Sequence, residues 1–266
     1  MALVPFDDRD GSIWINGEMV PWRDATSHTL SHGLHYASTV FEGERVYSGV
    51  IFKGREHTER LRNSCKIMDF ELPLGDDELD AAKMAVVEAN GIVDGYVRAF
   101  AWRGSEMMAI SAQHTTTHVA IAAWEWPSYF DPEVKMKGIT LDISDWKRPS
   151  PESAPVNAKA AGLYMICTLS KHAAEKKGFQ DALMLDYRGY IAEATGANVF
   201  FVDGEGTIHT PIADCFLDGI TRRTVIALAE SMQIKVVQRH LTLDDLSDMT
   251  ECFLTGTAAE VTPVSQ

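Results

Sequence analysis

The sequence lacks the features that mark secreted, membrane-spanning and nucleic-acid-binding proteins. No apolar run approaches the ~20 residues that cross a bilayer, and the opening MALVPFDDRDG does not have the basic-then-apolar order of a secretory signal. Basic residues are outnumbered, since 24 Lys and Arg stand against 38 Asp and Glu, for a formal net charge of −14. Such an acidic chain does not offer the basic patch that nucleic acid requires. We therefore expect a cytoplasmic protein with no membrane or nucleic-acid partner.

Cysteine is also scarce. The four cysteines, Cys65, Cys167, Cys215 and Cys252, form no C-x-x-C pair, and each has apolar neighbours in the sequence. This pattern indicates buried thiols in a reducing compartment rather than a disulfide framework or a zinc site.

Three histidines offer the one candidate metal motif. His28, His32 and His35 have a spacing that places ligands on one helical face. No glutamate follows as in H-E-x-x-H, and Gly33 is expected to break the helix. The sequence therefore predicts no metal site.

The first 126 residues predict a small α+β domain. Asn16-Gly17 inside SIWINGEMVPW is a strong hairpin signal. A helix is predicted over 56–69 from apolar residues at helical spacing, and another over 78–90 from its acidic start at Asp76-Asp77 and its stop at Gly91. The stretches 96–102 and 117–126 are rich in strand-forming residues. Two prolines within PSYFDPE then predict an interdomain linker at residues 127–134.

Residues 135–266 predict a second, larger domain. A strand at 138–144 precedes a Pro/Ser-rich loop and a helix from about Gly162 to Lys177, which Gly178 ends in a left-handed conformation. Strands and a helix over 221–232 complete the unit, and the sequence contains no internal repeat.

Lys159 is the first candidate for chemistry. It lies in VNAKAAGLY, among small apolar residues. An amine that is desolvated in such surroundings has a lowered pKa and can form a Schiff base. The alternative is a surface lysine whose stem lies along the protein while its amine reaches water.

Three further stretches supply complementary groups. Glu193 lies in a Gly-rich turn between predicted strands, where it either orients a ring nitrogen or is an exposed turn residue. Gly219-Ile220-Thr221 open a helix whose N–H groups favour an anion such as phosphate, unless Thr221 is an ordinary N-cap. Thr255–Ala259 form a second turn of small residues. Together with Lys159 these groups predict a pocket for pyridoxal 5'-phosphate (PLP).

The order of the motifs resembles the branched-chain-amino-acid aminotransferases, a class IV family of PLP enzymes with fold type IV. The matching stretches span essentially the whole chain: NGEMVPW, SHGLHYASTVFEGERVY, EHTERLRNSCKI, YVRAF, AKAAGLY, GYIAEATGANVFFV, DGITRRTVI and TGTAAEVTPV. The resemblance implies an α+β two-domain fold, with a small α/β N-terminal domain and a larger C-terminal domain containing a pseudo-barrel sheet.

The resemblance also implies a role for individual residues. Lys159 would hold PLP as a Schiff base and move protons, Glu193 would keep the pyridine nitrogen protonated, and Tyr164 would bind the ring oxygen. The remaining cofactor positions would be Arg60, Gly196, Asn198, Ile220, Thr221 and Thr257. The substrate positions would be Tyr36, Phe41, Gly43, Arg45, Tyr96, Arg98, Met108, Ile110, Tyr129, Thr257 and Ala258.

The implied reaction is ping-pong transamination between leucine, isoleucine or valine and 2-oxoglutarate. The implied assembly is a homodimer, or a higher oligomer, with active sites at the dimer interface. Arg98 is informative without any family, because a buried arginine in the apolar strand YVRAFAW is costly unless an acidic group or ligand meets it. Arg60 has a simpler alternative, a surface ion pair with Glu56 four residues earlier.

Other functions remain open at this stage. The same fold type includes transaminases of D-amino acids or (R)-amines and aminodeoxychorismate lyase, and a PLP-carrying binding protein is a non-enzymatic alternative. The sequence departs from the family at Leu163, Ala109 and Glu44, which affects the expected substrate range more than the reaction. The family's chains usually continue past TPV with a strand and a helix, so this chain is expected either to be a fragment or to lack that closing element.

Overall fold

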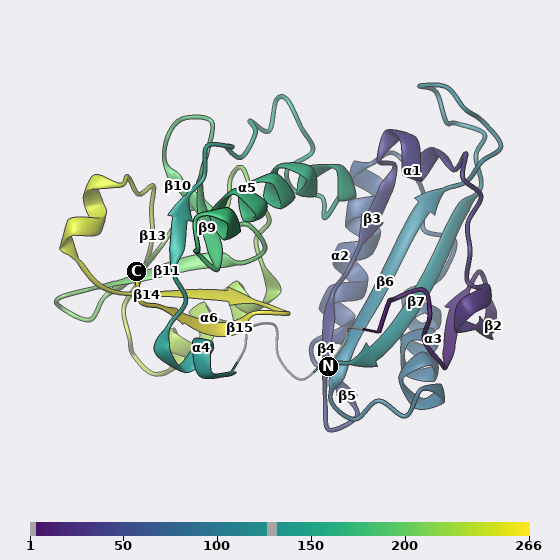
Figure 1. Ribbon diagram of the computed structural model, residues 1–266, viewed down its shortest axis with the longest axis horizontal. Coiled ribbons are helices and arrows are strands. Elements are labelled where there is room, and N and C mark those ends of the chain that lie inside the picture. Colours follow the sequence, from purple (N-terminus) through teal and green to yellow (C-terminus); the bar gives the residue numbers. More distant parts are fainter. Residues whose placement is uncertain (1–3, 127–131) are drawn as a thin grey trace. The chain divides into compact units, whose positions relative to one another are not determined.

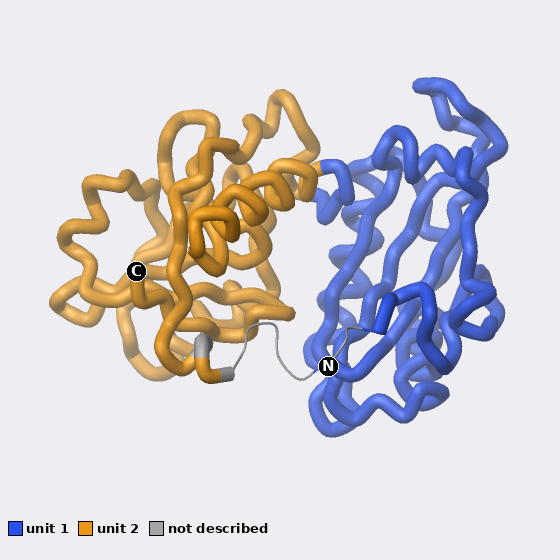
Figure 2. Tube along the Cα trace, viewed as in Figure 1, with its two compact units in different colours: residues 1–127, 158–162 blue, residues 128–157, 163–266 orange. Residues whose placement is uncertain are grey.

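The computed structural model describes residues 4–126 and 132–266. The chain divides into two compact units (Figure 2). Unit 1 contains Met1–Pro127 together with Ala158–Gly162, and unit 2 contains Ser128–Asn157 and Leu163–Gln266. Residues 127–131 of the predicted linker lie outside the described residues, and the predicted domain boundaries stay a prediction.

Unit 1 is built on an antiparallel sheet. Its described strands occur in the order β2-β1-β7-β6-β4-β5, with β3 also paired to β6. The strands are β1 (Ser12–Ile15), β2 (Glu18–Pro21), β3 (Thr39–Phe41), β4 (Glu44–Tyr47), β5 (Val50–Ile51), β6 (Gly95–Arg103) and β7 (Thr117–Glu125). The predicted hairpin is confirmed, because Asn16 and Gly17 join β1 to β2 with φ values of 50° and 104°. Both angles are those that a tight two-residue turn requires.

Helices α2 (Gly54–Ile67) and α3 (Asp76–Ala89) pack on this sheet and on each other (Figure 1). Both predicted helices are confirmed. The buried side chains Leu61 and Cys65 of α2 and Leu79 and Val86 of α3 recur at helical intervals. Each helix therefore turns an apolar stripe inward.

The short helix α1 (His32–Tyr36) corrects one expectation. Gly33 was expected to break a helix here, but it lies inside α1. A Cβ at Gly33 would be 2.7 Å from Thr39 Oγ1 and 2.9 Å from Trp102 Cβ. The glycine therefore allows close packing, and the helix instead ends at Ala37, which has a left-handed backbone with φ of 56°.

Unit 2 is built on a sheet that closes on itself. The strand order is β13-β12-β11-β10-β9-β8, and β11 also pairs with β14, which pairs with β15. The strands are β8 (Leu141–Ile143), β9 (Asp181–Leu185), β10 (Ile191–Ala194), β11 (Asn198–Asp203), β12 (Ile208–Thr210), β13 (Val236–Gln238), β14 (Met249–Gly256) and β15 (Glu260–Val264). Ile139 N donates to Pro263 O at 2.9 Å and Leu141 N to Gln266 O at 2.8 Å, so β15 returns to the start of β8. These bonds complete the predicted pseudo-barrel.

Helices cover this barrel on its outside, where α5 packs on β9 and α6 on β14. The remaining elements are α4 (Pro132–Lys137), α5 (Tyr164–Lys176), α6 (Ile220–Ser231), η1 (Trp22–Asp24, in unit 1), η2 (Ala161–Leu163) and η3 (Asp244–Asp248). Gly178 has φ of +90°, as expected for the residue that ends α5. Buried Leu183, Val199, Phe201 and Leu254 belong to the apolar core of unit 2. Throughout residues 4–126 and 132–266, no helix has the length and hydropathy of a membrane span.

A buried ion pair joins the sheet of unit 1 to α3. Lys83 Nζ lies 2.9 Å from Glu44 Oε2, and both residues are 1% exposed. Lys83 also donates to Thr58 Oγ1 at 2.7 Å and to Gly54 O at 2.9 Å. Burial raises the pKa of Glu44 to about 8, although Lys83 opposes the increase.

We predict that Glu44→Gln flattens the pH dependence of stability. The folded pKa of Glu44 is about 8 and its ordinary value is 4.5, so its contribution to stability is complete below pH 4.5 and is lost as the pH rises to about 8. One proton accounts for a slope of at most about 1.4 kcal/mol per pH unit. Urea unfolding of the wild type and the variant across this range measures it.

The matched control is Glu18→Gln on the exposed surface of β2. A Glu44→Gln variant whose stability curve stays parallel to that of the wild type would show that Glu44 titrates normally in the folded chain.

Candidate functional site

Lys159 is held in unit 1 by pairing with β3. Val40 and Ala160 form an antiparallel bridge, and Phe41 N donates to Lys159 O at 3.1 Å. Lys159 N donates to Ser64 Oγ of α2 at 3.0 Å. The neighbouring Ala158 and Ala160 are each 2% exposed. The segment therefore behaves as a short added strand, and Lys159 lies between two buried alanines.

The Lys159 amine lies in an environment that favours its neutral form. Its Nζ is 5.0 Å from the centroid of the Phe41 ring. Desolvation lowers the pKa of Lys159 to about 8; the charge of Arg60 adds to the decrease and the Glu42 carboxylate opposes it. At neutral pH a lysine with this pKa has a larger fraction of neutral, nucleophilic amine than an exposed lysine.

Strand register places several predicted substrate residues on one sheet face. The pairs Phe41↔Phe100 and Arg45↔Tyr96 belong to a single continuous register, so Gly43 lies opposite Arg98. Successive side chains of a strand point to opposite faces. Phe41, Gly43 and Arg45 thus share a face with the residues opposite them, whereas Glu42 and Glu44 point toward the helices.

The contacts on this face agree with the register. Arg98 Cζ is 4.5 Å from the centroid of the Phe41 ring, and Arg98 Nη2 donates to Tyr96 Oη at 3.3 Å. The Nε of Arg98 is buried and has no hydrogen-bond partner in the described part of the chain. A half-buried guanidinium with an unused buried donor is suited to an anionic ligand.

Gly43 and Arg45 frame the same surface. An ideal Cβ on Gly43 would lie 1.7 Å from Tyr96 Oη, so only glycine leaves room for that phenol. Arg45 Nη1 donates to Trp126 O at 2.9 Å, and its Cζ lies 5.1 Å from the centroid of the Tyr47 ring.

Arg60 of α2 forms an ion pair, but not the one with Glu56 that was the simpler alternative to phosphate binding. Its Nε and Nη2 donate to the two carboxylate oxygens of Glu42 at 2.7 and 2.8 Å. The surface pair with Glu56 is not formed, because Glu56 contacts Lys53 instead. His57 Nδ1 lies 2.6 Å from the same Glu42 carboxylate.

Three predicted substrate residues lie on exposed parts of unit 1. Tyr36 of α1 is 41% exposed, and Met108 and Ile110 of the loop between β6 and β7 are 44% and 84% exposed. His32 connects α1 to this loop through Nε2 and Ala109 O, 2.9 Å apart, and its ring stacks on Tyr36. Tyr129, also predicted at the pocket, lies outside the described residues.

Glu193 is the centre of a second group, in unit 2. The pairing of β10 with β9 is irregular between Ile191 and Glu193, a feature that often redirects a side chain near a functional site. Glu193 is 9% exposed. Its Oε1 lies 3.4 Å from Arg148 Nε, and its Oε2 lies 3.3 Å from Asn198 Nδ2.

The start of α6 lies beside this group. Gly219 is the N-cap and Thr221 lies inside α6, so the alternative of an ordinary threonine N-cap does not apply. N–H groups in the first helical turn lack intrahelical acceptors and attract anions. A Cβ on Gly219 would lie 2.2 Å from Asn198 Oδ1, so the cap and the Glu193 group are packed through Asn198.

The other predicted cofactor residues of unit 2 occupy turns or helix ends. Gly196 precedes β11, and a Cβ on Gly256 would lie 3.3 Å from Gly196 O. Thr257 and Ala258 follow in the turn between β14 and β15, so the two turns pack together. Tyr164 is the first residue of α5.

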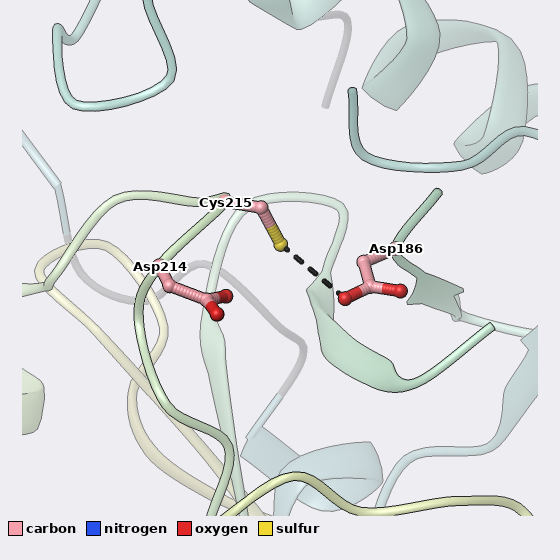
Figure 3. A group of neighbouring side chains, drawn as sticks. All are labelled: Asp186, Asp214 and Cys215. Atoms are coloured by element: carbon pink, nitrogen blue, oxygen red, sulfur yellow. Dashed lines mark hydrogen bonds between the residues drawn. The ribbon is translucent and has the colours of Figure 1, made fainter. Parts of the chain in front are cut away.

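One group of side chains in the described residues has the spacing of metal ligands: Asp186, Asp214 and Cys215 (Figure 3). Arg188 Nη2 lies 2.7 Å from Asp186 and 2.8 Å from Asp214. Burial raises the pKa of Cys215 to about 12. We interpret the group as an ion-pair cluster that stabilises the turn before β10, because a cation would have to displace Arg188.

A cavity of about 290 Å³ in unit 2 is unrelated to these groups. It is lined mainly by apolar side chains, among them Leu141, Phe201 and Met249, and contains no predicted site residue. Its lining includes Cys252, but burial raises the pKa of that thiol to about 12, so it stays protonated at neutral pH.

Sequence reasoning missed Glu42, His57 and Arg148 as parts of these groups. The sequence does single out Glu42, because a carboxylate inside the apolar stretch TVFEG needs a partner, just as Arg98 does in its apolar strand. His57 lies in the stretch EHTERLRNSCKI but has no role assigned there, and the partners of His57 and Arg148 are distant in sequence.

The comparisons with known proteins agree on one family. The family model for class IV amino-transferases matches residues 39–266. A probable branched-chain-amino-acid aminotransferase of Rickettsia conorii is 43% identical over 98% of this chain and 88% of its own.

Two solved structures are also similar to this chain. The crystal structure of the branched-chain amino acid aminotransferase of Escherichia coli has a TM-score of 0.93 at 39% identity, over 96% of this chain and 86% of that one. The branched-chain amino acid aminotransferase of T.th., complexed with N-(5'-phosphopyridoxyl)-L-glutamate, has a TM-score of 0.91 at 39% identity, over 97% of this chain and 85% of that one.

We predict that Gly43→Ala displaces the Tyr96 phenol, because the added Cβ overlaps its oxygen. Tyr96 packs against Trp124 and Trp126, with ring centroids 5.2 and 5.4 Å away. Its movement should therefore change the tryptophan emission spectrum and cost about 1–3 kcal/mol of unfolding free energy. Gly204→Ala, which places its Cβ in open space, is the control. Identical emission from Gly43→Ala and the wild type would contradict the packing described.

Proposed function

This chain belongs to the class IV aminotransferases, and within them to the branched-chain-amino-acid aminotransferases; we propose that it exchanges the amino group of leucine, isoleucine or valine with 2-oxoglutarate. The observation that carries the proposal is Lys159, whose amine has a lowered pKa beside Arg60 and Phe41. The family is PLP-dependent, and the cofactor supplies an aldehyde that links to amines and a ring that accepts negative charge from the adjacent carbon.

The residues of this chain fit that cofactor. Unit 1 supplies the amine of Lys159, whose pKa is about 8. Unit 2 supplies a buried carboxylate, Glu193, and a helix start without a side-chain cap. The amine suits the cofactor's aldehyde, the carboxylate suits its ring nitrogen, and the helix start suits its phosphate.

In the proposed reaction, Lys159 is the residue that moves protons. Its neutral amine accepts the proton from the α-carbon of the amino acid and returns a proton to the neighbouring cofactor carbon. Such general acid–base transfer typically contributes about 10²–10⁴-fold to the rate. The lowered pKa of Lys159 increases the fraction of neutral amine at physiological pH.

We assign the remaining cofactor contacts as proposals. Glu193 holds the proton on the ring nitrogen, and Tyr164 binds the ring oxygen. The phosphate is bound by Arg60, by the first-turn N–H groups of Ile220 and Thr221, and by Thr257. Gly196 and Asn198 shape the turn beside Glu193, since the Asn198 amide lies 3.3 Å from that carboxylate.

The substrate pocket must accept both an apolar side chain and a second carboxylate. Phe41, with Met108 and Ile110, supplies apolar surface. Arg98 and Tyr96 offer donors to the carboxylate of a glutamate-like substrate, for which charge-assisted bonds are short and strong. The other proposed pocket positions are Tyr36, Gly43, Arg45, Tyr129, Thr257 and Ala258.

The assembly and the cellular location are also proposals. Exposed Tyr36, Met108 and Ile110 are apolar and lie on α1 and the loop joined to it, which supports a homodimer that covers them. The acidic composition and scarce cysteines support a cytoplasmic location. We propose residues 1–126 and 135–266 as the two domains.

An amine-donor panel tests the function. With 2-oxoglutarate as acceptor, L-leucine, L-isoleucine and L-valine should release their 2-keto acids with ping-pong kinetics, whereas D-alanine and (R)-phenylethylamine should not. Turnover of the D-amino acid or the (R)-amine in preference to L-leucine would replace the proposal with another transaminase of this fold. Binding of PLP without turnover of any donor would indicate a binding protein.

Replacement of the lysine tests the mechanism. Lys159→Ala should abolish transamination, because both the covalent link and the proton carrier are lost, while noncovalent PLP binding remains measurable. Turnover is measured by keto-acid release and the link by the visible absorption band. Lys147→Ala, in the loop before Lys159, is the control and should retain both signals. Transamination by Lys159→Ala near the wild-type rate would refute the assignment.

A further inference from the structure

We propose that Glu42 is a positioning residue for the cofactor's phosphate, which it serves by fixing the guanidinium of Arg60. The inference deepens the proposed function and rests on the assignment of Arg60 as a phosphate-binding residue. Glu42 itself does not touch the phosphate in this proposal.

Arg60 and Glu42 form a bidentate ion pair. Arg60 donates from Nε at 2.7 Å and from Nη2 at 2.8 Å, one bond to each carboxylate oxygen of Glu42. Two parallel bonds fix the plane of a guanidinium as well as its position. The other N–H groups of Arg60 then have a defined direction before any ligand arrives.

Glu42 is itself held rigidly. It is 0% exposed, its N donates to Ala99 O at 2.7 Å, and His57 Nδ1 lies 2.6 Å from Oε2. Burial alone would raise the pKa of the Glu42 carboxyl, but the charge and hydrogen bonds of Arg60, assisted by His57, hold it well below its usual range. Burial lowers the pKa of His57, so a neutral imidazole donates from Nδ1 to a carboxylate that stays ionised.

The negative charge of Glu42 offsets the positive charge of nearby basic groups. Arg60, Arg98 and Lys159 bring three basic groups to one part of unit 1, where Arg60 and Arg98 each lower the pKa of Lys159 and Glu42 opposes them. A buried guanidinium without a carboxylate is costly and shifts toward other acceptors. Glu42 keeps Arg60 in one place while the phosphate is absent, and preorganisation of this kind reduces the ordering cost of binding.

Glu44 provides a matched control two residues along the same strand face. It is 1% exposed and carries the same side chain, but its partner is Lys83 of α3 rather than Arg60 of α2. A general effect of a buried glutamate on the stability of unit 1 should appear at both positions. An effect on phosphate recognition should appear at Glu42 alone.

The experiment compares PLP with pyridoxal, which has the same aldehyde and ring but no phosphate. Dissociation constants of both are measured on the apoprotein by absorbance, and their ratio reports the phosphate, because changes at Lys159 affect both ligands. Glu42→Gln should reduce the preference for PLP about tenfold, or about 1.4 kcal/mol, with pyridoxal affinity nearly unchanged. Glu44→Gln should leave the ratio at the wild-type value.

A double-mutant cycle establishes the route of the effect. Arg60→Met should lower the ratio, and adding Glu42→Gln to it should produce no further loss. Glu42→Asp keeps the charge but shortens the side chain, so its preference for PLP should lie between those of the wild type and Glu42→Gln. It replaces Glu42→Gln in the experiment if circular dichroism shows that the glutamine variant is unfolded.

Three results would overturn the proposal. Glu42→Gln could keep the wild-type preference for PLP over pyridoxal, or Glu44→Gln could lose as much of that preference as Glu42→Gln. The third is that the losses from Arg60→Met and Glu42→Gln add in the double variant. A wild-type ratio in Arg60→Met would remove the assignment of Arg60 and this inference with it. The proposed transamination would be unaffected by any of these results, since the donor panel tests it separately.

Discussion

The backbone bridge between Val40 and Ala160 is the constraint on which the site of unit 1 depends. These residues are far apart in the chain. The bridge attaches Ala158–Gly162 to unit 1, whose other residues are Met1–Pro127. Since Phe41 N donates to Lys159 O, the lysine is aligned by the same pairing that positions the Phe41 ring. Its amine is therefore positioned by sheet geometry rather than by a helix of its own.

The segment from Val40 to Val46 has two roles, because its side chains alternate between the helix-covered face of the sheet and the opposite face. Val40, Glu42, Glu44 and Val46 are all nearly fully buried on the side of the helices. The residues between them face the surface that carries Tyr96 and Arg98. Two buried carboxyl groups on the helix side would be costly alone, and each has a basic partner: Arg60 for Glu42 and Lys83 for Glu44. The segment thus links the positions of two helices to the sheet face that carries Tyr96 and Arg98.

Local patterns predicted much of the fold, because their physical basis is local. Asn16-Gly17 and Gly178 have the backbone angles that their turn and cap require, and α2 and α3 show the apolar spacing of packed helices. Gly33 was misjudged, since close contact with Thr39 and Trp102 outweighs its low helix propensity. Glu42, His57 and Arg148 depend on partners across the fold. Without the register that brings β3, β6 and α2 together, no local pattern specifies their contacts.

The closure of the unit 2 sheet has a consequence for how the chain behaves among its neighbours in a concentrated solution. An open sheet exposes unpaired N–H and C=O groups that can template the addition of another chain. In unit 2 the bonds from Ile139 and Leu141 to the end of β15 remove that edge, and the edge strand β13 has only three residues. The edges of the other sheet are equally short: β5 has two residues, and β2 has four and ends in Pro21. The architecture thus protects both sheets from the edge-to-edge association that leads to aggregation.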